Sequence, residues 1–152
     1  MKFITSGSTS PKRSVSHRTL FALKIKKMNN NDFIDYLKNN LHNAGDGLIR
    51  QIRINLAEYK IILELSVENS EGWFNLEIIA ENISEFTIRQ KRNEDLQVIF
   101  NMDIQIIDGL YWFNLDCVEV NYDINQIRKS NFYFVCETFN VSFLPYQEKI
   151  SE

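Results

Sequence analysis

The stretch "LQVIFNMDIQIIDGLYWFNLDC", residues 96–117, decides the predicted fold because two apolar runs of period two flank a turn dipeptide. Asp108-Gly109 is typical of a two-residue hairpin turn, in which both residues adopt positive φ. That turn sets the register and predicts Asp103 opposite Asn114 on a face open to water. It also predicts one buried face shared by both strands, made of Phe100, Met102, Ile104, Phe113 and Leu115.

The same alternation appears on both sides of this hairpin. It predicts strands at 52–56, 61–67, 74–80 and 86–88, and a last strand over 130–143. Within the last strand the apolar phase changes between Cys136 and Phe139. The change indicates either a β-bulge near Glu137-Thr138 or burial of both faces.

One segment, "NNDFIDYLKNNL" at 30–41, has helical periodicity, with Phe33, Leu37 and Leu41 at four-residue spacing. We expect Asn31 to cap its start, and Gly45 and Gly47 to end it with left-handed geometry. The sequence therefore predicts an α+β, mostly β fold. One N-terminal helix precedes an antiparallel meander of about six to seven strands, arranged as a sandwich or a partly open barrel.

Length and composition indicate a single β-rich domain, 28–152, preceded by a basic leader, 1–27, with Met28 as a natural start. The leader is interpreted as an upstream extension. An organelle-targeting segment or a short strand through Phe21, Leu23 and Ile25 are the alternatives. We expect it to contribute little to stability. Two cysteines fit a reducing cytoplasm, and no apolar run reaches the ~18 residues of a membrane span.

Charge is distributed unevenly along the chain. Residues 1–31 contain seven of the 17 Lys and Arg and no acid, so residues 32–152 contain ten bases and all 20 acids, a net charge of −10. An acidic surface repels nucleic acid and attracts cationic proteins. We therefore expect a basic protein partner and no nucleic-acid partner.

Candidates for chemistry are few. His42, oriented by Asp46, could act as a general base, but no candidate nucleophile lies near it in the sequence. The alternative is structural, because a histidine at the end of a helix can donate a hydrogen bond to the free backbone carbonyls there. Cys117 and Cys136 lack metal-ligand spacing and lie in apolar phase. We expect no catalytic residue, no metal and no cofactor.

A partner surface is the remaining kind of site. If the loop "NSEG" closes a hairpin, Glu64 lies opposite Glu77, and like charges on neighbouring strands are unfavourable unless something offsets them. With Asp103 and Asp116 on the other hairpin, the sheet would present an acidic face. The alternative is that these acids only contact solvent and bind no partner. Trp73 and Trp112 could stack on a ligand, or could be ordinary half-buried sheet aromatics.

The order of features from Leu41-His42 to "FYFVCETFNVSF", over about residues 32–144, resembles small bacterial β-rich families, some of them immunity proteins of toxin systems. In those families a short helix ending in Leu-His precedes amphipathic strands, and a late strand carries a cysteine, here Cys136. This chain departs from them at Asn43, where an acid is expected. The resemblance implies a cytosolic binder without catalytic residues.

The leading hypothesis is therefore a small cytoplasmic binding protein, an immunity protein that neutralises a basic, nuclease-type toxin through an acidic sheet face. The partner-binding residues would be Glu64, Glu77, Asp103, Asp116, Trp73 and Trp112. The alternatives are a β domain that binds a small apolar ligand, an interaction domain with no ligand, and an enzyme with His42 as its base. The oligomeric state is left open.

Overall fold

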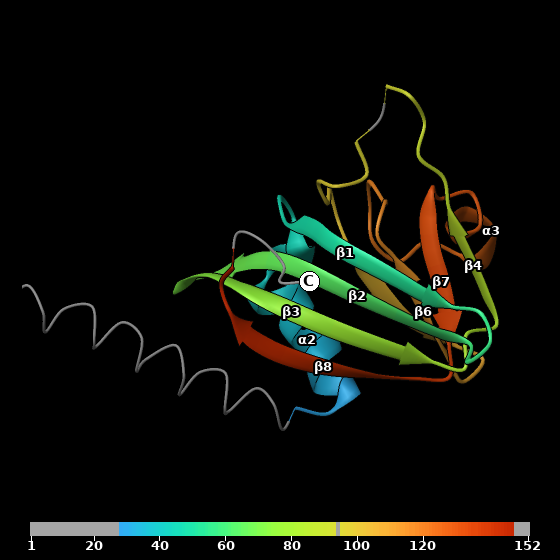
Figure 1. Ribbon diagram of the computed structural model, residues 1–152, viewed down its shortest axis with the longest axis horizontal. Helices are drawn as coiled ribbons and strands as arrows, with labels where there is room; N and C mark the ends of the chain where they lie inside the picture. Colours follow the sequence, from blue (N-terminus) through green and yellow to red (C-terminus); the bar gives the residue numbers. More distant parts are fainter. Residues whose placement is uncertain (1–27, 94, 148–152) are drawn as a thin grey trace, which may run out of the picture.

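The computed structural model describes residues 28–93 and 95–147, which form two packed four-stranded antiparallel sheets and a helix (Figure 1). Sheet A has the order β1-β2-β3-β8, with bounds Leu48–Asn55, Lys60–Asn69, Gly72–Glu81 and Thr138–Pro145. Sheet B has the order β4-β7-β6-β5, with bounds Glu85–Ile88, Phe132–Cys136, Leu110–Asn114 and Asp103–Ile107. The predicted mostly β fold is confirmed, in its sandwich form.

Helix α2 (Asn30–Asn40) lies behind sheet A in Figure 1 and covers the β8 side of the core. Its cap is Asn29, whose side chain accepts a 2.9 Å hydrogen bond from the Asp32 amide, so the predicted cap at Asn31 is wrong by two residues. Phe33 meets Phe139 and Phe143 of β8 edge-on, each with 6.2 Å between ring centroids. No helix among the described residues is long and apolar enough to cross a membrane.

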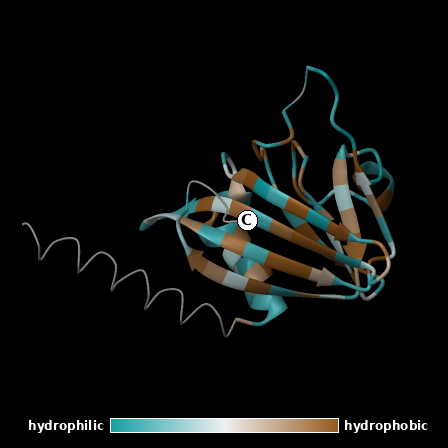
Figure 2. Ribbon diagram, in the orientation of Figure 1, coloured by the Kyte–Doolittle hydropathy of each residue, from teal (hydrophilic) through white to brown (hydrophobic). Residues whose placement is uncertain are grey.

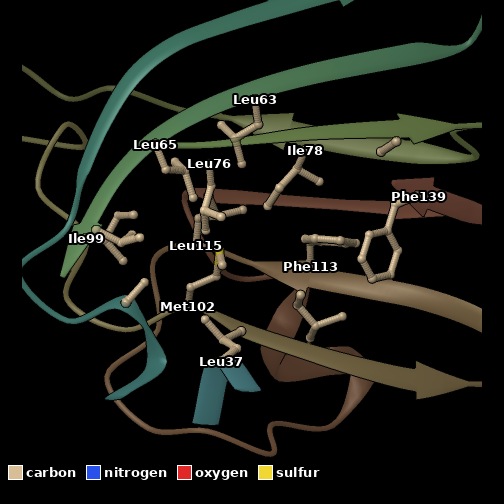
Figure 3. Close-up of a cluster of buried hydrophobic side chains, with 14 of the residues drawn as sticks. Leu37, Leu63, Leu65, Leu76, Ile78, Ile99, Met102, Phe113, Leu115 and Phe139 are labelled. Carbon is tan, nitrogen blue, oxygen red and sulfur yellow. The ribbon is translucent and has the colours of Figure 1, made fainter. Parts of the chain in front are cut away.

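The core lies between the two sheets and is built largely from aromatic and branched side chains (Figure 3). Phe113 of β6 stacks on Phe134 of β7 with 4.5 Å between centroids, and Phe139 meets Phe113 edge-on at 5.0 Å. Leu63, Leu65, Leu76 and Ile78 approach this cluster from sheet A. Burial of these side chains is the main stabilising contribution to the fold.

Both predicted hairpin registers are confirmed. Asp103 pairs with Asn114 and Ile104 with Phe113, and the turn residues Asp108 and Gly109 have φ of 53° and 78°. In the second hairpin Glu64 pairs with Glu77, and a two-residue connection joins Asn69 to Gly72. Turn chemistry therefore determined strand alignment.

The long strand predicted over 96–106 is shorter than expected, since β5 begins at Asp103. Residues 97–102 instead run beside the start of β1, where Leu48 bridges Val98 and the Ile49 amide donates to the Gln97 carbonyl at 2.8 Å. Ile99 is buried there, while Phe100 is 65% exposed, so the prediction that Phe100 lies on the buried face is wrong. Met102, Ile104, Phe113 and Leu115 are buried as predicted.

The predicted wet face of this hairpin is also wrong. Asp103 is 3% exposed and Asn114 is 2% exposed, because residues 118–130 fold over the outer face of sheet B. This covering segment contains α3 (Ile124–Ile127) and packs Ile127 against Trp112 and other side chains of the sheet. The Asn121 amide donates to the Asp103 carboxylate at 2.8 Å, which fastens the segment to β5.

Burial of both faces, one of the two suggested explanations, holds for β7, but the phase change near Glu137 itself has a third explanation. β7 ends at Cys136 in sheet B, and β8 begins at Thr138 in sheet A. Phe134 and Phe139 both point into the core, but they reach it from opposite layers. A strand that changes sheet must reverse its apolar phase in order to keep facing the same core.

The turn that ends helix α2 differs from the predicted one, in which glycines adopt the left-handed conformation. His42, Asn43 and Ala44, which make the short helix η1 (His42–Ala44), have φ of 50°, 57° and 55°, whereas Gly45 has φ of −56°. The left-handed geometry is thus adopted by side-chain-bearing residues. The interpretation of residues 1–27 lies outside the described residues; Met28 itself packs against the core.

Candidate functional site

The six residues predicted to bind a partner are divided between the two sheets. Glu64, Glu77 and Trp73 belong to sheet A, whereas Asp103, Asp116 and Trp112 lie on the side of sheet B that the covering segment encloses. Asp103 and Trp112 are 3% and 5% exposed, so neither can contact a partner. Asp116 is partly buried and accepts a 3.0 Å hydrogen bond from Asn131. The prediction of a single acidic face is therefore wrong: of its four acids, Glu64 and Glu77 lie together on the outer face of sheet A, and Asp103 and Asp116 lie on sheet B.

The outer face of sheet A carries the side chains of β1, β2 and β3 that point away from the core, and Figure 2 shows the alternation that places them there. Glu64 and Glu77 lie side by side on it. Arg53 Nη2 of β1 is 3.2 Å from Glu64 Oε1 and 3.8 Å from Glu77 Oε2. The side chains of Glu64, Glu77 and Arg53 are 14%, 27% and 51% exposed. Arg53 thus offsets the like-charge pair within the chain, leaving one net negative charge among the three groups.

A row of polar side chains crosses three strands at the other end of this face. Arg50 Nε donates to Ser66 Oγ at 2.8 Å, and Ser66 Oγ donates to Asn75 Oδ1 at 2.7 Å. Asn75 Nδ2 then donates to the Gln147 carbonyl at 3.3 Å, and Arg50 also reaches the Tyr146 hydroxyl at 3.3 Å. Ser66 and Asn75 are buried although they face outward.

Sequence reasoning missed this row because outward polar positions on a strand are ordinarily wet. The available signal was the pairing of Ser66 with Asn75 in the β2–β3 register, which sets two hydrogen-bonding side chains opposite each other. The row holds Tyr146 over this end of the sheet, where its ring lies 6.2 Å from that of Trp73. Trp73 is consequently half-buried, and its role on this face is in part structural.

The residues considered for chemistry are separate from one another. His42 is exposed in the left-handed turn, while Cys117 and Cys136 are buried. Burial raises the pKa of both thiols to about 12, with a further contribution to Cys117 from Asp103 and Asp116, so both remain protonated at neutral pH. Across residues 28–93 and 95–147, no group of three or more His, Cys, Asp or Glu is placed to hold a metal ion.

Two apolar grooves lie between the edge strands β1 and β4. One, of about 440 Å³, is lined by residues that include Ile54, Leu56, Tyr59, Ile83 and Phe86. The other, of about 260 Å³, is lined in part by Ile49, Ile52, Ile88, Leu96 and Phe132. Neither groove is lined by Trp73 or Trp112, the residues that the sequence suggested as stacking platforms.

No family model, curated protein or solved structure matches this chain at a significant level.

Proposed function

We propose that this protein is a small binding protein that neutralises a basic protein, of the nuclease-toxin class, by holding it against the outer face of sheet A. The observation that supports the proposal is an asymmetry between the sheets. Residues 118–130 cover the outer face of sheet B, whereas on the outer face of sheet A the side chains of Glu77 and Arg53 are partly exposed beside the more buried Glu64. Among residues 28–93 and 95–147 no segment covers these charged side chains, and such a face is a surface on which a partner can dock.

The charges on this face determine what the partner must supply. Glu77 is the more accessible of the two carboxylates, and Arg53 is its longer-range partner at 3.8 Å. An arginine or lysine of a basic protein can therefore bind Glu77 while Arg53 keeps its closer contact with Glu64. Nucleases carry such side chains because they bind phosphate. The net charge of −10 over residues 32–152 would accelerate the encounter, and added salt would slow it.

The test uses titration calorimetry to measure binding to a purified basic toxin, taken as the product of the gene next to the one that encodes this protein. The variant is Glu64→Gln with Glu77→Gln, because lysines here would place three cations together with Arg53 and disturb the sheet. We expect at least a tenfold loss of affinity, about 1.4 kcal/mol. Asp35→Asn with Glu119→Gln is the matched control, since it makes the same change in net charge at exposed positions away from this face. Equal affinity for both double variants would contradict the proposal.

The second candidate function is binding of a small apolar ligand. The groove of about 440 Å³ lined by Ile54, Leu56 and Phe86 favours it, because ligand pockets commonly have about 300–1,000 Å³. A fluorescent fatty acid is a suitable probe. Saturable binding that Leu56→Asp abolishes would support this function, and binding that is unchanged in Leu56→Asp would exclude this groove.

A further inference from the structure

Arg50 is a cation on the outer face of sheet A that neutral groups hold in place. It is half-buried on β1, and it makes no ion pair with a carboxylate of residues 28–93 and 95–147. Its hydrogen bonds go to the hydroxyl oxygens of Ser66 and Tyr146. We propose that Arg50 binds a carboxylate side chain of the partner protein, as a second charged contact beside Glu77. The inference rests on the proposed function, in which the partner docks on this face.

An irregularity in β1 places Arg50 on the outer face. Ile49 pairs with Leu65 and Gln51 pairs with Glu64, so Arg50 is an extra residue without a partner in the β1–β2 register. Ile49 faces the core, and strict alternation would turn Gln51 toward the core as well. The extra residue instead sets Arg50 and Gln51 on the outer face together. Bulges of this kind commonly re-aim a side chain next to a functional site.

The guanidinium of Arg50 retains donors for an anion. Nε donates to Ser66 Oγ at 2.8 Å, and Nη2 donates to the Tyr146 hydroxyl at 3.3 Å. Both N–H groups of Nη1 and the second of Nη2 have no acceptor among the described residues. Nη1 and Nη2 lie side by side at the end of the planar group, so one carboxylate can accept hydrogen bonds from both.

The guanidinium is also fixed before a partner binds. Ser66, which accepts from Nε, is buried and donates to Asn75 Oδ1 at 2.7 Å, so the acceptor is itself held in place. A long surface side chain ordinarily loses conformational freedom when it binds, which weakens the contact. Because Arg50 is already held from two sides, it loses little of that freedom.

Two aromatic rings complete this corner of the face. Tyr146 accepts a hydrogen bond from Arg50, and its ring lies 6.2 Å from the ring of Trp73. All three residues are half-buried. Arginine, tyrosine and tryptophan are the residue types that most often dominate the energy of protein interfaces. The corner made of Arg50, Tyr146 and Trp73 therefore has the composition of a binding hot spot.

The place of Arg50 determines which charges the partner must carry. Asn75, in the row of polar side chains that includes Arg50, and Glu77 are two residues apart on β3, which is about 7 Å along the strand. The face thus presents a carboxylate and a guanidinium in neighbouring rows. A matching partner has a basic side chain opposite Glu77 and an acidic one opposite Arg50. A uniformly basic surface would be repelled by Arg50, so this contact selects among basic proteins.

Titration calorimetry with the same purified toxin tests the proposal. Arg50→Gln should weaken binding at least tenfold, although it makes the chain more acidic and the toxin is basic. Arg50→Lys keeps the charge without the planar fork and should lose less. Lys129→Gln is the matched control, because it makes the same change in net charge at an exposed position on the segment that covers sheet B. It should bind as tightly as the wild type or slightly more tightly. Equal affinity for Arg50→Gln and Lys129→Gln would overturn the proposal.

A structural variant separates binding from stability. Tyr146→Phe removes one acceptor of Arg50 but keeps the guanidinium and the aromatic ring. Thermal melts are expected to show some loss of stability in both Tyr146→Phe and Arg50→Gln, whereas only Arg50→Gln should lose affinity for the toxin. A loss of affinity in Tyr146→Phe as large as that in Arg50→Gln would show that the row is structural and overturn the proposal.

The two charged contacts can fail separately. Weak binding by Glu64→Gln with Glu77→Gln, together with wild-type binding by Arg50→Gln, would leave the proposed function in place and overturn this inference. The opposite result would support Arg50 and count against the acidic contact. A wild-type chain that does not bind the toxin would overturn both.

Discussion

Arg128 donates two hydrogen bonds to the carboxylate of Glu85, at 2.8 and 3.2 Å. Tyr133 donates a third to Glu85, also at 2.8 Å, and the Arg128 guanidinium lies 5.4 Å from the centre of the Trp112 ring. Glu85 is in β4, Tyr133 is in β7, and Arg128 ends α3. This cluster therefore ties the covering segment to β4, an edge strand of sheet B.

The Glu85 cluster predicts one source of acid sensitivity. The hydrogen bond from Arg128 lowers the pKa of the Glu85 carboxyl, and the bond from Tyr133 lowers it further against the opposing effect of burial. A carboxyl with a lowered folded-state pKa stabilises the fold above its unfolded pKa, and this stabilisation is lost as pH falls through the folded value. Glu85→Gln should therefore be less stable than the wild type at neutral pH, with the difference shrinking as the pH falls below the ordinary range of a glutamate carboxyl. Thermal melts across this range measure it. Glu119→Gln is the control, and a difference independent of pH would disprove the assignment.

Substitution of Asp103 tests how much its carboxylate stabilises the covering segment on sheet B. Its carboxylate accepts hydrogen bonds from the Asn121 amide and from Gln105 Nε2, at 2.8 and 3.1 Å, and it is 3% exposed. Asp103→Ala should lower the free energy of unfolding by about 1–3 kcal/mol, because two donors in partly buried hydrogen bonds lose their acceptor. Asp103→Asn retains one oxygen and should cost less. Urea denaturation gives both values, and equal losses for the two variants would show that hydrogen bonding is not the cause.

Gly47 and Gly45 form a matched pair in the turn after α2. A Cβ atom added at Gly47 would lie 2.8 Å from the Ala44 carbonyl oxygen, whereas one at Gly45 would lie 3.4 Å from its nearest neighbours. Gly47→Ala should therefore destabilise the protein by about 1–3 kcal/mol through overpacking. Gly45→Ala should have a much smaller effect, since 3.4 Å is ordinary contact. Thermal melts of the two variants decide the point, and a larger loss at Gly45 would be inconsistent with this packing.

Substitution of Gly109 is predicted to lower the free energy of unfolding through backbone conformation alone. Its φ is 78°, and a Cβ atom there would meet nothing within 4 Å. Gly109→Val should destabilise by about 1–2 kcal/mol, because a side chain in the left-handed region approaches its own carbonyl and a β-branched residue does so most. Gly109→Asn should be tolerated better, since asparagine adopts positive φ more readily. The free energies of unfolding test this order, and its reversal would count against the type of turn.

Local sequence patterns were sufficient to predict the registers of the two hairpins. Asp108-Gly109 sets the β5–β6 register and the connection after Asn69 sets the β2–β3 register, and both agree with the structure. The reason is physical: a tight turn brings residues close in sequence into contact, so the pairing depends on nothing distant. Helix α2 likewise follows from its own apolar spacing, although its cap lies two residues earlier than expected.

Burial of the second face of each sheet depended on distant parts of the chain. Asp103 has the polar phase of a wet residue, yet residues 118–130 cover it. Glu64 and Glu77 form the predicted like-charge pair, yet Arg53 from β1 offsets it. The candidate site was therefore half predictable: the pair could be aligned from sequence, but the groups around it could not.

By itself, then, the sequence determined the mostly β class, the helix and the two hairpin registers, because these arise from periodicity and turn chemistry within about ten residues. Tertiary structure alone decided that the segment from Phe132 to Phe143 crosses between sheets at Glu137, and that β1 and β4 are left as neighbouring edges. An apolar phase records that a side chain is buried. It carries no information about which layer holds the strand or which distant segment covers it.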